Sequence, residues 1–134
     1  MKRTILAFVA GLVTWVLVAS VLDRVLRALL DGYTAAELQM HFRLGMMAAR
    51  LTIAMISSLM AGAVMGAVAP SSTRVPWVLG VILLAAFLPA HVALWHNFPI
   101  WYHLTFFGTL LPLLVLGAHL RGSVRRTSTA PEAS

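Results

Sequence analysis

The chain has 134 residues, of which 60% are hydrophobic and only 10% are charged, with a net charge of +6 and a mean hydropathy of +0.91. Soluble domains average about 25% charged residues, so this composition indicates a membrane protein and leaves no room for a separate soluble domain. The chain contains no cysteine, which excludes disulfides, thiolate metal sites and thiol catalysis.

Most of the chain consists of four apolar segments, each about the 20 residues that a helix needs to cross a bilayer. Hydrocarbon offers the backbone no hydrogen-bond partner, so spanning segments of this length form helices. We therefore predict an all-α membrane protein whose four transmembrane helices form an antiparallel up-down bundle over residues 1–121. The predicted helices cover about residues 4–31, 35–69, 75–95 and 99–121. The polar residues 122–134 are predicted to form a disordered cytoplasmic tail.

The first two helices are predicted to extend beyond the membrane. The helical spacing of apolar residues continues to Gly32, a typical helix stop, and Thr34 with Glu37 matches a capping box that starts the second helix. At about 1.5 Å per residue, both helices are longer than the hydrocarbon core of about 30 Å. The hairpin between them should therefore project from the membrane or bend along its surface.

The N-terminus also permits a second interpretation. Lys2 and Arg3, the apolar run that follows and the small residues at 18–20 resemble a secretory signal with a cleavage site. The apolar run is long for a signal and merges into a continuing helical pattern, so we expect it to remain as the first helix. Cleavage would leave three helices in the same orientation.

The distribution of Lys and Arg predicts the orientation, because short cytoplasmic loops retain these residues. One end of the predicted bundle carries six of them, with Glu132 as its acidic residue: Lys2, Arg3, Arg74, Arg121, Arg125 and Arg126. The basic residues at the other end are offset by acidic ones: Arg24, Arg27, Arg43 and Arg50 against Asp23, Asp31 and Glu37. We therefore expect a multi-pass membrane protein with both termini in the cytoplasm. Arginine outnumbers lysine nine to one amid abundant Ala, Leu, Val and Gly, a usage that points to a GC-rich bacterial genome and hence to a bacterial inner membrane. The basic residues do not gather on one polar surface, so the expected partner is the lipid bilayer and not nucleic acid.

The second predicted helix carries a ridge of small residues spaced by four: Ala54, Ser58, Gly62 and Gly66. Small side chains let two helix backbones approach closely, which is how helices associate in lipid. Two partners fit this ridge, another helix of the same chain or a second copy in a homo-oligomer. Packing inside the chain is the simpler interpretation, because a four-helix bundle already supplies a partner.

The last two predicted helices are joined by only a few residues, so they should be antiparallel neighbours. Aromatic side chains mark membrane interfaces, where rings with a polar edge favour the headgroup layer. On this basis Trp77 anchors the inner interface, and Trp95, Trp101 and Tyr102 anchor the outer one.

Four ionisable residues should lie at one depth, just inside the outer leaflet, and form a polar ring: Asp23, Arg50, His91 and His103. His91 lies one helical turn before Trp95 and His103 lies on the next helix, so the two imidazoles should approach each other. Ionisable groups inside a membrane are costly and often functional, and we also predict that Asp23 pairs with Arg50. The structural alternative is that Arg50 extends to lipid phosphate and the histidines bond to a backbone carbonyl or to interfacial water.

The remaining patterns favour neither an enzyme, nor a metal site, nor a bound cofactor. No serine elbow, phosphate-binding glycine loop or buried acid pair is present in the sequence. His91 and His96 are five residues apart, which is a poor spacing for zinc on one helix. Haem between His91 and His103 would need ligands from opposed faces of an open interior, and so short a connection does not favour that arrangement.

Residues 98–107, with the sequence FPIWYHLTFF, and the opening MKRTILAFVAGLVTWVL resemble a group of uncharacterised small four-helix bacterial inner-membrane proteins. The distinctive part is residues 101–106. The resemblance spans nearly the whole chain and implies the same four-helix membrane fold. The group has no assigned activity, so the resemblance implies no catalytic or binding residue.

These observations leave three functions open. The first is a non-enzymatic accessory or structural partner in the inner membrane, with the small-residue ridge and the aromatic outer connection as contact surfaces. The second is an oligomeric carrier or channel for small molecules or protons, although the inner halves of the last two helices are almost purely apolar. The third is the binding of a lipid, a quinone or haem at the outer polar ring.

Overall fold

The computed structural model describes residues 1–128, and in this part of the chain every regular element is a helix. The helices are α1 (Lys2–Leu29), α2 (Tyr33–Gln39), α3 (Leu44–Val68), α4 (Arg74–Ala93) and α5 (Ile100–Ser128). Four of these, α1, α3, α4 and α5, are long and apolar enough to cross a membrane. The predicted all-α class and its four long apolar helices are confirmed.

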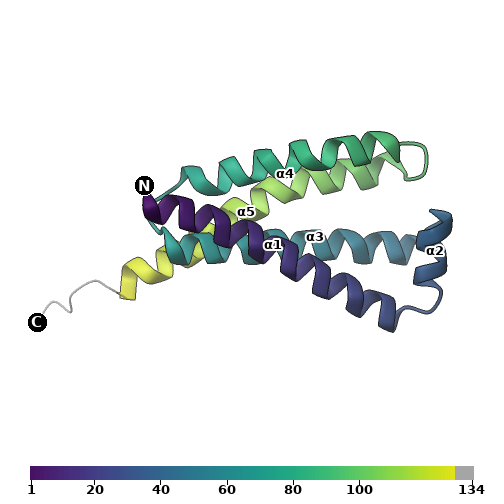
Figure 1. Cartoon of the computed structure of the whole chain (residues 1–134), viewed down its shortest axis with the longest axis horizontal. Coiled ribbons are helices and arrows are strands. Elements are labelled where there is room, and N and C mark those ends of the chain that lie inside the picture. The colour runs from purple at the N-terminus through teal and green to yellow at the C-terminus, as the bar shows by residue number, and fades with distance from the viewer. Residues whose placement is uncertain (129–134) are drawn as a thin grey trace, which may run out of the picture.

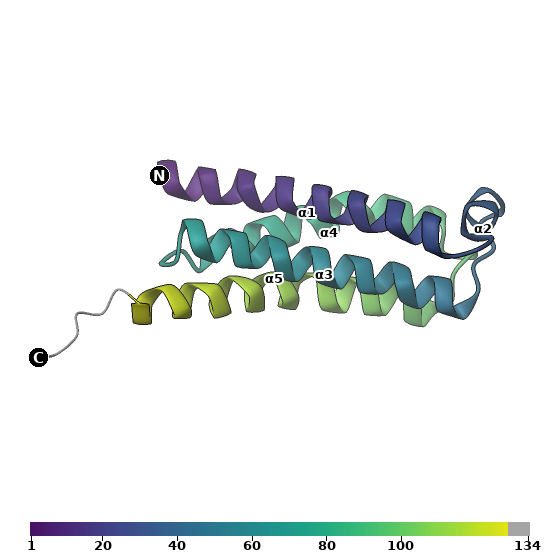
Figure 2. The same cartoon turned by 90° about the horizontal axis from the view of Figure 1, so that it is seen from below.

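Figures 1 and 2 show α1, α3, α4 and α5 side by side in one elongated bundle. The short α2 and the connection between α4 and α5, residues 94–99, lie at one end, which we call the α2 end. The N-terminus and the connection between α3 and α4 lie at the opposite end. The central helix is α3, since it makes the most extensive contacts in the bundle, first with α5 and then with α1.

The prediction of one continuous helix over residues 35–69 is wrong. Residues 40–43 separate α2 from α3, because Met40 adopts a left-handed conformation with φ of 51°. The backbone N–H of His41 then donates to the carbonyl of Ala36 at 3.0 Å, which closes the last turn of α2. The break lets α2 turn across the end of the bundle (Figure 1) instead of continuing the line of α3.

The predicted capping box is also wrong. The residue before α2 is Gly32, whose φ of 80° suits glycine, and no side chain caps this helix. Thr34 lies within α2, and Glu37 pairs instead with arginine side chains of α1 and α3. A small apolar cluster holds α2 across the end of the bundle. In this cluster, Tyr33 of α2 is fully buried and packs with Met46 of α3.

The helix ends differ from the prediction most at the C-terminus. The first helix ends at Leu29, close to the expected boundary. The last helix continues to Ser128, so residues 122–128, predicted to be part of a disordered tail, are helical. Gly122 does not end α5, because a glycine inside a helix costs only about 1 kcal/mol. Residues 129–134 of the predicted tail lie outside the described residues.

The glycines of the small-residue ridge on α3 pack within the chain. Gly62 lies against the backbone of Leu114 and Gly66 lies against that of Ala118, so a methyl group at either glycine would overlap a backbone carbonyl of α5. Gly117 of α5 meets the backbone of α3 in the same way. The two helices are therefore in direct backbone contact, the arrangement that small residues permit between membrane helices.

The other two residues of the ridge, Ala54 and Ser58, are also buried. The indole Nε1 of Trp15 in α1 donates a hydrogen bond to Oγ of Ser58 at 3.1 Å, so two buried polar groups satisfy each other. The ridge thus meets α5 through its glycines and α1 through Ser58, and it is used inside the chain.

The outward surface of the long helices is apolar. Many large hydrophobic side chains on α1 and α4 are about half exposed: Ile5, Val9, Val13, Val16, Leu17, Val78, Val81, Ile82, Leu88 and Val92. Small and polar residues such as Gly62 and Ser58 lie inside, together with large apolar residues such as Leu79, Leu110 and Leu114. So extensive an exposed apolar surface would be unfavourable in water, and it suits contact with lipid.

We predict that Gly62→Ala lowers the stability of the bundle, because the added methyl meets a backbone carbonyl of Leu114 that cannot move aside. Overpacking of this kind costs about 1–3 kcal/mol. Gly108→Ala in α5 is the matched control: nothing lies within 4 Å of the added methyl, so this change should be neutral or stabilising. Thermal unfolding in mild detergent, followed by circular dichroism, compares the two. Equal melting temperatures for both variants would contradict the close packing of α3 on α5.

Candidate functional site

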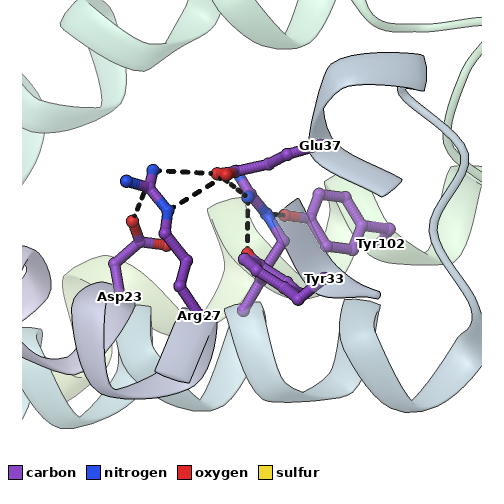
Figure 3. A network of polar contacts seen from close by, with 6 residues as sticks. Asp23, Arg27, Tyr33, Glu37 and Tyr102 are labelled. Atoms are coloured by element: carbon purple, nitrogen blue, oxygen red, sulfur yellow. Dashed lines mark hydrogen bonds and ion pairs between the residues drawn. The ribbon is translucent and has the colours of Figure 1, made fainter. Parts of the chain in front are cut away.

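A network of charged side chains joins α1, α2 and α3 at the α2 end of the bundle (Figure 3). Nη2 of Arg27 in α1 lies 2.9 Å from a carboxylate oxygen of Asp23, one turn earlier on the same helix. Nε of Arg27 lies 3.0 Å from Oε2 of Glu37 in α2, and its Nη2 donates to Oε1 of the same carboxylate at 3.1 Å. Arg27 therefore ties α2 to α1.

Arg50 of α3 is the second cation of the network. Its Nη1 donates to the hydroxyl of Tyr33 at 2.8 Å and lies 3.5 Å from Oε1 of Glu37. Its Nε donates to the hydroxyl of Tyr102 in α5 at 3.5 Å. The guanidinium carbon also lies 5.0 Å from the centre of the Phe42 ring, a distance at which a cation and a ring attract each other. Arg50 thus links α2, α3 and α5.

The hydroxyl of Tyr33 is a neutral member of this network. The side chain is fully buried. Burial raises the pKa of its hydroxyl, and the neighbouring Arg50 guanidinium acts in the opposite direction. The hydroxyl therefore stays protonated at neutral pH and accepts the hydrogen bond from Arg50 without carrying a charge.

The predicted ion pair between Asp23 and Arg50 is wrong in its partners. Asp23 pairs with Arg27, and Arg50 pairs with Glu37, although Asp23 and Arg50 line the same cavity. The break after α2 explains the difference, because it turns α2 across the bundle and brings Glu37 between the two arginines.

The two histidines of the predicted polar ring approach each other as expected. Nδ1 of His91 in α4 lies 2.7 Å from Nδ1 of His103 in α5, a hydrogen bond in which either ring can be the donor. Both side chains are buried, with exposed fractions of 8% and 1%. Among the described residues, Nε2 of His103 has no hydrogen-bond partner. Buried polar atoms are almost always paired, so this nitrogen requires an explanation.

Aromatic rings enclose the histidine pair. Trp95 stacks on His103 with 4.8 Å between ring centres. Phe106 and Phe107 lie 4.5 Å and 4.7 Å from the ring of His91. The two imidazoles are therefore fixed in position by their mutual hydrogen bond and by the rings around them.

Further aromatic rings connect the surroundings of the histidine pair to α1. Phe87 of α4 lies 5.2 Å from Phe106 of α5 and also 5.2 Å from Trp15 of α1, measured between ring centres. We call these three residues the aromatic layer. It lies nearer the middle of the bundle than the charged network does, because Trp15 precedes Asp23 on α1 by about two helical turns.

Two cavities meet in this region. The larger, of about 390 Å³, is lined by the charged network and the aromatic layer, including Asp23, Arg27, Glu37, Arg50, Trp15 and Phe87. The smaller, of about 150 Å³, is lined by the histidine pair together with Leu94 and Phe98. Four residues line both cavities: Arg50, Phe87, Tyr102 and Phe106. The polar ring predicted from the sequence thus corresponds to two neighbouring cavities that share Arg50 as a wall residue.

The larger cavity is amphipathic along the bundle axis. Its charged residues on α1, Asp23 and Arg27, lie near the α2 end, and Trp15 lies nearer the middle of the helix. A molecule with one polar and one apolar part matches this order. In residues 1–128, no group of three or more His, Asp or Glu side chains is placed to hold a metal ion.

The predicted interface anchors divide into two kinds. Trp77, Trp95 and Trp101 are each between 39% and 53% exposed, whereas Tyr102 is buried. The ring of Tyr102 stacks on Phe98 with 4.6 Å between centres, and its hydroxyl accepts the bond from Arg50. Tyr102 therefore belongs to the site.

Sequence reasoning missed Tyr33 and Glu37 as site residues. A continuous helix over residues 35–69 would have placed Glu37 about 20 Å from Arg50 along the helix axis, too far for an ion pair. A usable indication was present, because the polar residues Gln39 and His41 interrupt the apolar spacing at the point where the chain breaks.

We predict that Tyr33→Phe and Arg50→Gln are energetically coupled. Each change removes the same 2.8 Å hydrogen bond, so the double variant should lose less stability than the sum of the single losses, by about 1 kcal/mol or more. Thermal unfolding in mild detergent measures all three variants. Arg24→Gln, which changes an exposed cation of α1, is the matched control and should be additive with Tyr33→Phe. Additive losses for Tyr33 and Arg50 would show that the bond does not exist.

Comparisons with known proteins add no assignment to this geometry. No protein-family model, curated protein or solved structure matches the chain. The function must therefore be argued from the two cavities and the residues that line them.

Proposed function

We propose that this chain is a non-enzymatic integral membrane protein that binds a membrane-soluble amphiphile in the larger cavity. Its four long helices cross a bacterial inner membrane as an antiparallel up-down bundle, with both termini in the cytoplasm and the α2 end outside. The half-exposed apolar side chains of α1 and α4 support a lipid environment. The excess of Lys and Arg near the termini supports the orientation. The resemblance of residues 98–107 to small bacterial membrane proteins supports the same assignment.

In this proposal, the end of α1 and the whole of α2 lie at the outer surface of the inner membrane. The 28 residues of α1 would span about 42 Å at 1.5 Å per residue, more than the hydrocarbon core of about 30 Å. The charged network then lies at the level of the lipid headgroups. Water and headgroups are available there to the partly exposed Asp23 and Arg27.

The observation that carries the proposal is the amphipathic cavity of about 390 Å³. Small-molecule sites in proteins commonly have volumes of about 300–1,000 Å³, with mostly apolar walls and a few polar groups that fix orientation. In a membrane, a ligand held here would have its polar part beside Arg50 and Glu37 and its apolar part against the aromatic layer. Lipid-like molecules of the outer leaflet have this same orientation.

The ionisable residues support a binding role. Charged side chains within a membrane are costly, and they are retained mainly where they pair with each other or serve a site. Here the two arginines are balanced by the two carboxylates, so the network carries no net charge and suits a ligand that is neutral overall.

The other expected functions have less support. A partner-binding role is left with the aromatic outer connection as its surface, because α5 and α1 cover the small-residue ridge. A carrier or channel would need a polar path through the bundle, whereas the aromatic layer packs apolar rings between α1, α4 and α5.

We predict that Ala19→Phe reduces ligand binding, because Ala19 lines the larger cavity and a phenyl ring would fill part of it. Ala28→Phe adds the same ring at an exposed position of the same helix and is the matched control. Native mass spectrometry of protein purified in mild detergent reports any retained molecule as an added mass. We expect the added mass in the wild type and in Ala28→Phe, and its loss in Ala19→Phe. A wild type without any retained molecule, or equal retention in both variants, would refute the proposal.

A further inference from the structure

One fully buried polar atom of the histidine pair has no hydrogen-bond partner among the described residues. His103 is 1% exposed, its Nδ1 is bonded to His91, and one face of its ring is covered by Trp95. Nε2 is the remaining polar atom of this ring, and it has no partner among the described residues. A bound molecule with a hydrogen-bonding group would supply the missing partner.

The hydrogen bond between the two rings lets this nitrogen present either a donor or an acceptor. Each neutral imidazole carries one N–H. When His91 donates from Nδ1, His103 carries its own N–H on Nε2 and offers a donor. When His103 donates from Nδ1, its Nε2 carries a lone pair and offers an acceptor, while His91 carries its N–H on its own Nε2. Both arrangements keep the pair neutral and keep the hydrogen bond between the rings.

This property matches a ligand whose bound oxygen can be either a hydrogen-bond acceptor or a hydrogen-bond donor. The carbonyl oxygen of a quinone accepts a hydrogen bond, and the hydroxyl of the corresponding quinol donates one. Quinones are also neutral, ring-shaped and membrane-soluble, which agrees with a charge network that is balanced without a ligand. A phospholipid headgroup, in contrast, carries ionised groups even where it is neutral overall, and it has no planar ring.

The smaller cavity has the size and the walls for such a ring. Its volume is about 150 Å³, and cavities of about this volume in other proteins take up benzene. Phe98, Tyr102 and Phe106 provide aromatic walls. Arg50 and Tyr102 line both cavities, so a chain attached to the ring can continue into the larger cavity.

We propose that the amphiphile is a quinone, bound with its ring in the smaller cavity and one oxygen hydrogen-bonded to Nε2 of His103. The polar ring then lies beside Arg50, and the apolar chain continues along the aromatic layer, which lines the apolar part of the larger cavity. This inference rests on the proposed function and specifies the chemical class of its ligand. His103 acts as a binding residue, and His91 sets which form of the ligand His103 can meet.

The test is a titration of the protein in phospholipid nanodiscs with a short-chain benzoquinone, ubiquinone-1, and separately with its quinol. Tryptophan fluorescence is the readout, because Trp95 lies against His103 and a bound quinone would quench it. We expect saturable quenching with the quinone in the wild type. His103→Leu should weaken binding about tenfold, the loss expected for one hydrogen bond in a buried site. His103→Gln places an amide near the position of Nε2 and should restore part of the affinity.

His119→Leu, which changes a histidine of α5 toward the opposite end of the bundle, is the matched control and should bind like the wild type. Circular dichroism confirms that each variant is folded, and the Gln variant distinguishes a lost hydrogen bond from a damaged fold. We expect the quinol to compete for the same site in the wild type. Equal affinity of the wild type and His103→Leu would overturn the inference.

The outcome also separates this inference from the proposed function. A protein that retains a phospholipid in native mass spectrometry, yet shows no saturable quenching, would refute the quinone and leave amphiphile binding intact. A protein that retains no molecule and shows no quenching would refute both.

Discussion

The structure depends on one constraint, which is that the four long helices expose many large apolar side chains on the outer surface of the bundle, in addition to those in its core. In the lipid environment that we propose, the buried apolar core alone gives little driving force for association, because lipid is as apolar as the side chains that it meets. Close backbone contact takes its place, with Gly62 and Gly66 of α3 set against α5. Buried polar groups add specific links, such as the bond from Trp15 to Ser58.

The same constraint explains why the paired arginines and carboxylates of α1, α2 and α3 lie at the α2 end. A charged group in hydrocarbon is costly, so it needs a partner or a place near the headgroups. Arg27 and Arg50 have both, since they share Glu37 and lie toward the end of the bundle. The proposed binding site therefore lies where the polar and apolar parts of the molecule meet, and the two cavities are at this junction.

Much of this fold could be predicted from the sequence, because the four apolar segments have the length of a membrane crossing. The contact between His91 and His103 was predictable as well, since a short connection sets the two helices in register. The break at residues 40–43 was not. It depends on a left-handed Met40 and on long-range partners of Glu37, and helical spacing contains neither. Without that break, neither the correct ion pairs nor the cavity between α1 and α3 could be derived.

Cysteine labelling tests most directly whether the bundle lies in lipid with its α2 end outside. The chain contains no cysteine, so each introduced cysteine can be labelled alone. Single cysteines are introduced at Asn97, Ser72 and Val81 and treated with a membrane-impermeant thiol reagent. We expect labelling of Asn97→Cys in intact spheroplasts, labelling of Ser72→Cys only after disruption, and no labelling of Val81→Cys, although Val81 is 58% exposed on α4. Ready labelling of Val81→Cys, or labelling of the other two from the same side, would contradict this arrangement.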